Sequence, residues 1–67
     1  MSVIISILLW LGAISAGTYT YSEFDAIEAS NSAQIQLIES NSELTALIVA
    51  TTDPSVVTLR NGEEGDH

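Results

Sequence analysis

The chain has no cysteine, no lysine, one arginine (Arg60) and one histidine (His67) among its 67 residues. Without cysteine it can form neither a disulfide nor a thiolate metal site. Nine acidic residues give it a formal net charge of −8. Because this charge repels phosphate groups, we expect no nucleic-acid partner. It also repels anionic lipid headgroups, so attachment to a lipid bilayer would have to come from apolar side chains.

Patterns that carry catalysis or ligand binding are missing as well. His67 is the last residue, so a Ser–His–acid triad would need a chain terminus to hold a fixed geometry. On one helix, Glu28 and Glu39 would lie about 16 Å apart, too far for paired acid–base work. No glycine-rich phosphate loop or metal-ligand spacing occurs. We therefore expect no enzyme activity, no cofactor, no metal ion and no small-molecule substrate.

What the sequence does contain is a long apolar opening. Residues 3–16 read VIISILLWLGAISA, and no charge appears before Glu23. As a helix, residues 3–21 would span about 28 Å, nearly the hydrocarbon core of a bilayer. Tyr19 and Tyr21 would then lie at the membrane interface. The sequence thus predicts a transmembrane helix over residues 1–21 and a single-pass membrane location.

A cleaved signal peptide is the competing interpretation of this opening. Small residues at Ser15 and Gly17, or at Ala13 and Ser15, permit cleavage, but no basic residue precedes the apolar stretch. Cleavage would release a secreted acidic peptide. The length of the uncharged stretch favours the uncleaved anchor. Since no Lys or Arg lies near either end of the span, the sequence does not fix its topology.

Small residues four apart within the expected span let two helix backbones approach closely in a membrane. The predicted packing residues are Gly12, Ala13, Ala16 and Gly17.

Residues 22–53 are predicted to form one amphipathic helix that begins at Ser22 and ends before Pro54. Its apolar positions recur every eleven residues, which is typical of a straight or slightly right-handed seam. A second apolar stripe on another side of the helix indicates a second neighbour, as in a bundle. The seam residues expected to bind partners or further copies are Phe24, Ile27, Ile35, Ile38, Ala46 and Val49. The second stripe consists of Ala26, Ala33, Leu37, Leu44 and Ile48.

Strands are the alternative for the same region. Residues 34–37 alternate in polarity, residues 47–49 and 56–59 are strand-like, and the Ser/Asn groups at 30–32 and 41–42 resemble turns. Ala, Glu, Gln and Leu dominate residues 23–48, and these residue types favour the helix. After Pro54, we expect an extended segment at residues 56–60 and then a disordered acidic tail.

Taken together, these features predict a mainly α protein with three segments, residues 1–21, 22–53 and 54–67. The expected function is that of a small, non-enzymatic structural or assembly component at a membrane. It would contact the lipid bilayer, and through helix packing it would bind protein partners or copies of itself in a coiled-coil arrangement. Its small size and lack of chemistry favour a virion or phage-encoded structural protein. The alternatives are a holin-like lysis pore and the secreted acidic peptide.

Overall fold

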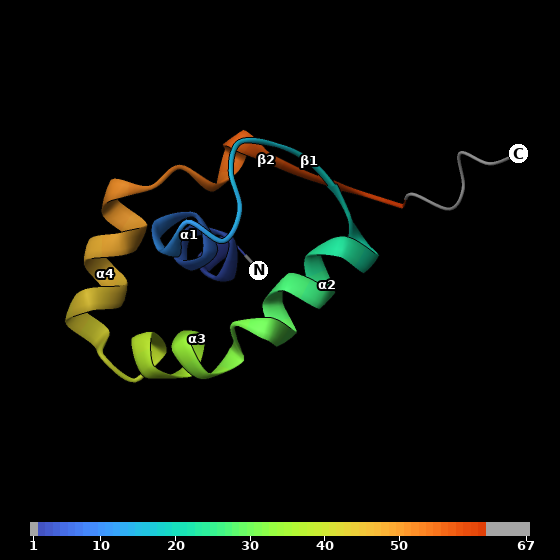
Figure 1. The fold of residues 1–67 in the computed structure, drawn as a ribbon. Helices are drawn as coiled ribbons and strands as arrows, with labels where there is room; N and C mark the ends of the chain where they lie inside the picture. The colour runs from blue at the N-terminus through green and yellow to red at the C-terminus, as the bar shows by residue number, and fades with distance from the viewer. Residues whose placement is uncertain (1, 62–67) are drawn as a thin grey trace, which may run out of the picture.

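The computed structural model describes residues 2–61 and shows a mainly helical fold with a small sheet (Figure 1). Mainly helical content was predicted, but the predicted arrangement of one membrane helix followed by one long rod is wrong. The elements in chain order are α1 (Ser2–Leu11), β1 (Gly17–Thr20), α2 (Tyr21–Ser30), α3 (Ser32–Glu39), α4 (Ser42–Thr51), the 3-10 helix η1 (Pro54–Val56) and β2 (Val57–Arg60).

Helix α1 is about half as long as the predicted membrane helix. It stops because Gly12 adopts a φ of +81°, a left-handed conformation that glycine reaches without steric cost and that often ends helices. The N–H groups of Gly12 and Ala13 donate to the carbonyls of Leu9 (3.1 Å) and Leu8 (3.0 Å), which closes the last turn. Its ten residues extend about 15 Å, against about 30 Å for a hydrocarbon core.

No helix within residues 2–61 combines the length and the apolar character that crossing a membrane requires. This finding contradicts the predicted transmembrane helix over residues 1–21, the single-pass description and the membrane location. The physical reason is that a glycine-terminated turn and a strand follow α1, where the sequence analysis expected the helix to continue.

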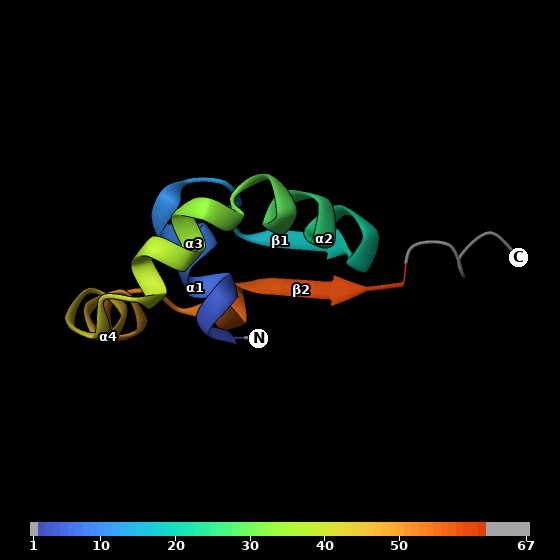
Figure 2. The same cartoon turned by 90° about the horizontal axis from the view of Figure 1, so that it is seen from below.

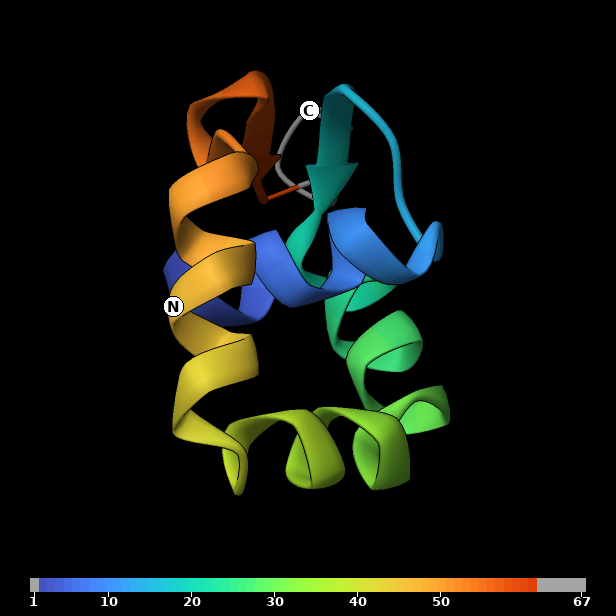
Figure 3. The same ribbon diagram turned by 90° about the vertical axis from the view of Figure 1, so that its left-hand side faces the viewer.

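Helix α1 instead lies in the middle of the molecule, with α2, α3, α4 and the strands around it (Figures 1 and 3). Four consecutive residues, Ile5 to Leu8, are buried. Since successive side chains on a helix are about 100° apart, these four buried residues mean that the middle of α1 is covered all round, while Val3 and Trp10 nearer its ends are exposed. One of them, Ser6, has a buried hydroxyl for which the structure gives no hydrogen-bond partner.

The region predicted as one helix over residues 22–53 is divided into α2, α3 and α4. Helix α2 begins at Tyr21, and its N-cap is Thr20 rather than Ser22. The Thr20 hydroxyl accepts from the Glu23 N–H (3.0 Å), and a Glu23 carboxylate oxygen accepts from the Thr20 N–H (2.9 Å). This reciprocal pair is a capping box, which fixes the start of the helix.

Two asparagines mark the breaks between these helices. The side-chain amide of Asn31 donates to the Ile27 carbonyl (2.8 Å) at the end of α2. The side-chain oxygen of Asn41 accepts from the Leu44 N–H (3.1 Å) and caps the start of α4. Asparagine competes with the helical backbone in this way, which is why it favours helix ends. The breaks bend the three helices into a horseshoe around α1 (Figure 3).

The strands β1 and β2 pair in parallel, with Gly17 beside Val57 and Thr20 beside Arg60 (Figure 2). The extended segment predicted at residues 56–60 corresponds to β2, whereas residues 17–20 were predicted to lie in the membrane helix. A strand at 17–20 was missed because its uncharged residues were read as the end of the apolar opening. The acidic tail predicted after Asn61 lies outside the described residues.

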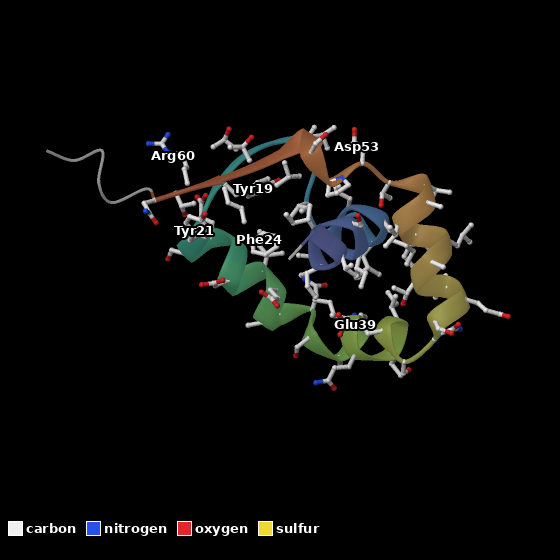
Figure 4. The ribbon with its side chains drawn as sticks, turned by 180° about the vertical axis from the view of Figure 1, so that it is seen from behind. Tyr19, Tyr21, Phe24, Glu39, Asp53 and Arg60 are labelled. Atoms are coloured by element: carbon white, nitrogen blue, oxygen red, sulfur yellow. The ribbon has the colours of Figure 1, made fainter. Side chains whose placement is uncertain are left out.

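The core joins α1 to every other part of the fold. Figure 4 shows Phe24, which is fully buried, pointing from α2 toward the middle of the molecule. The buried apolar residues are Ile5, Ile7, Leu8, Ile14, Phe24, Ile35, Ile38, Ile48 and Val57.

Candidate interaction surface

The part of the chain that the structure describes contains no pocket. It also contains no group of three or more His, Cys, Asp or Glu side chains arranged to hold a metal ion. Within residues 2–61, a functional site would therefore lie on the outer surface.

The residues predicted to pack two membrane helices lie in or next to the connection between α1 and β1. Gly12 ends α1 and Gly17 begins β1, with Ala13 and Ala16 between them. Ala13 is half-buried and packs against the core, while the other three are exposed. The structure does not place these four residues on one helical face.

The predicted seam residues fall into two groups. Phe24, Ile35 and Ile38 are buried, and Ile27 is half-buried against the same core, so the structure brings these four together around α1. The remaining two seam residues are exposed and face away from the core: Ala46 and Val49.

The eleven-residue repeat of apolar positions is interrupted between α3 and α4. The two Ser-Asn-Ser groups, at 30–32 and 40–42, are ten residues apart, and the second lies at the break before α4. The chain turns there, so that Leu44 and Ile48, from the predicted second stripe, face the core in place of the seam residues. Because α3 and α4 are two separate helices, the residues of α4 that face the core are not those that the eleven-residue spacing predicts.

The consequence is an apolar surface on the outside of α4. At 100° per residue, Ala46 and Ala50 lie about 160° from the buried Ile48, and Leu47 and Val49 lie on the two flanks between. All four are exposed, Leu47 to 55% and Val49 to 46%. We call these four residues, Ala46, Leu47, Val49 and Ala50, the outer face of α4.

Carboxylates lie at both ends of α4. Glu39 is the last residue of α3, Glu43 lies in the first turn of α4, and Asp53 follows the helix; all three are exposed. Figure 4 shows Arg60 at the end of β2 that is remote from α4.

Asp53 is held as a carboxylate by its own loop. The Ser55 hydroxyl (2.6 Å) and the Ser55 N–H (3.0 Å) both donate to its Oδ1. These hydrogen bonds, the hydroxyl first, lower the pKa of Asp53 below its ordinary value. Asp53 would be ionised at neutral pH even at its ordinary pKa, so the C-terminal end of α4 carries a negative charge there.

Leu37 is more exposed than Leu47 or Val49, at 72%, but it does not extend the outer face of α4. Its neighbours one turn away on α3 and the following residues are Ala33, Gln34, Ser40 and Asn41, most of them polar. Single exposed leucines are ordinary on protein surfaces. Leu37 thus offers a matched control for experiments on Leu47.

Leu47 and Ala50 were not predicted as site residues, because neither falls on the seam or on the second stripe. The signal that would have found them is the composition of residues 44–50, LTALIVA, which is apolar on every side of a helix. An apolar helix without a polar face needs neighbours all round.

Comparisons with known proteins add no relative: no protein-family model, no curated protein and no solved structure matches this chain.

Proposed function

We propose that this chain is a non-enzymatic assembly component that binds another protein through the outer face of α4. The observation that carries the proposal is that α4 is apolar on both sides. Leu44 and Ile48 are used by the core, while the outer face has no neighbour within residues 2–61.

The energetic argument favours a protein partner. Fully burying a leucine or valine side chain stabilises a complex by about 1.5–3 kcal/mol, so covering half-exposed Leu47 and Val49 contributes about 1 kcal/mol each. The two small residues between them, Ala46 and Ala50, allow a partner helix to approach closely. A contiguous apolar surface of this kind on a helix is typical of protein interaction sites.

The setting predicted from the sequence, a virus or phage particle, stays a prediction. The assembly role proposed here needs no membrane span and differs in that respect from the expectation drawn from the sequence.

The test is site-specific photo-crosslinking in the cells that naturally produce the chain. A photoreactive amino acid is placed at position 47, and in a matched control at position 37, where a leucine is also exposed. We expect one discrete protein adduct from position 47 and none from position 37. No adduct at 47, or the same adducts from both positions, would refute the proposal.

A further inference from the structure

We infer that the occupant of the outer face of α4 is a basic amphipathic helix of another protein, a conclusion that rests on the proposed function above. This partner helix carries a short apolar stripe with Lys or Arg at both of its ends.

The first step is the charge around the surface. The chain carries −8, and three of its nine acidic residues, Glu63, Glu64 and Asp66, lie outside residues 2–61, which leaves six within them against Arg60 alone. A basic partner neutralises part of this charge on binding, and opposite charge also speeds the encounter of two proteins.

The second step is where the charges lie on α4. No ionisable residue occurs between Glu43 and Asp53, so the outer face is an uncharged stretch with an acidic residue at each end. Helix α4 has ten residues and is about 15 Å long. A complementary helix therefore has two to three apolar turns, followed at each end by a cationic side chain.

The third step excludes a second copy of this chain as the favoured occupant. Two copies would together carry −16 and two arginines. If their α4 helices paired in parallel, Glu43 would meet Glu43 and Asp53 would meet Asp53. If they paired antiparallel, Glu43 of each would meet Asp53 of the other. Both arrangements place like charges together, which opposes association.

The fourth step concerns shape. Ala46 and Ala50 lie one turn apart along the middle of the outer face, with Leu47 and Val49 standing on either side. The two alanines place small side chains between larger ones. A leucine or methionine on the partner helix fits over them, as ridges of one helix fill grooves of another.

The experiment uses two synthetic peptides of about 18 residues, long enough to form a helix. Both carry the same leucine and alanine stripe, one with lysine and the other with glutamate at its two ends. Each is titrated into the isotope-labelled full chain, and binding is followed by backbone amide chemical shifts at about 0.05 M and about 0.5 M salt.

We expect the lysine peptide to shift the amides of α4 and to bind at least about tenfold more tightly than the glutamate peptide. High salt should weaken its binding. The substitution Leu47→Glu should abolish it, while the matched control Leu37→Glu should leave it unchanged. Glu43→Lys should weaken it while keeping the apolar surface intact. Circular dichroism on each variant shows that the fold is retained.

The opposite outcomes separate the inference from the function on which it rests. Equal binding of both peptides, or no binding of either, overturns the inference. Self-association in sedimentation equilibrium that Leu47→Glu abolishes also overturns it, because a second copy is then the occupant. In each of these cases the proposed function still stands if position 47 crosslinks to a protein in cells, and falls if it does not.

Discussion

Replacing Ser6 by alanine should stabilise the protein. The Ser6 side chain is 1% exposed, and its hydroxyl has no hydrogen-bond partner in the structure. Leaving a buried polar group without a partner costs about 1–3 kcal/mol, and alanine also has a helix propensity better than that of serine by a few tenths of a kcal/mol. Removing the oxygen atom also loses its dispersion contacts, about 0.1–0.2 kcal/mol for each atom pair, and this loss offsets part of the gain. The expected net gain is about 1–2 kcal/mol.

The measurement is urea unfolding of the full chain, followed by circular dichroism at 25 °C. The midpoint should rise in Ser6→Ala while the denaturant slope stays the same, since the substitution changes stability and not the surface exposed on unfolding. In thermal unfolding, each kcal/mol corresponds to about 4–8 °C for a chain of this size. The matched control is Ser22→Ala, which removes the same atom at an exposed position of α2. There we expect a change within about 0.5 kcal/mol.

A Ser6→Ala variant as stable as the parent chain, or less stable, would refute this reasoning. Such a result would mean that the Ser6 hydroxyl has a partner in solution.

Four further predictions follow from the same structure. Phe24→Ala removes the largest fully buried side chain and should lower the free energy of unfolding by about 3–5 kcal/mol. Because a chain of this length has a free energy of unfolding of about 3–10 kcal/mol, thermal unfolding of the variant should lose most of its cooperative transition. Gly12→Ala should cost about 1–2 kcal/mol in urea unfolding through its φ of +81° alone, since its new Cβ meets open space, and Gly12→Asn should cost less. Thr20→Ala should lower the free energy of unfolding by about 1 kcal/mol, whereas Thr20→Ser should leave it close to that of the parent, because serine, unlike alanine, keeps the hydroxyl that caps α2. Ser55 lowers the pKa of Asp53 in the folded state. The stability that the ionised Asp53 contributes is therefore fully present above its ordinary pKa of 3.8 and is lost as the pH falls through the lower folded pKa. In acid titrations of unfolding, the stability difference between the parent and Asp53→Asn should shrink below about pH 3.8.

The helices of residues 21–51 and the turns between them were both visible in the sequence, but as rival interpretations. The helical interpretation rested on Ala, Glu, Gln and Leu, and residues 34–37 and 47–49 are indeed helical rather than extended. The rival interpretation placed turns at the Ser/Asn groups, and Asn31 and Asn41 are where the helices break. Each was right about different residues. Treating the two as exclusive produced a continuous rod.

The residues of α2 and α3 that face the core were predictable, and those of α4 were not. A seam read from Phe24 to Ile38 follows the helical period, and the core uses these residues. Beyond the break at Asn41, the direction of α4 depends on how the chain turns, and local periodicity carries no information about that turn. The sequence therefore identified the apolar residues of α4 without showing which of them face the core.

The position of α1 could not be read from its composition. A run of apolar residues is compatible with a membrane span and with a buried core helix, and only length separates the two. Here the length is set by Gly12, whose left-handed conformation becomes apparent only once the chain turns back into β1. The uncharged residues 13–21 made the stretch look longer than the helix it contains.

The same rule explains α1 and points to a partner for α4. A helix that is apolar on every side must be covered on every side. The middle of helix α1 satisfies this condition within the chain, since Ile5 to Leu8 are buried without a gap, whereas Trp10 near its end is 47% exposed. Helix α4 satisfies it only where Leu44 and Ile48 meet the core, and Leu47 and Val49 remain about half exposed. With three helices already bent around α1, no further helix of residues 2–61 is left to cover α4. The proposed partner would supply this missing neighbour of α4, and the acidic residues at both ends of the helix specify the charge that the partner should carry.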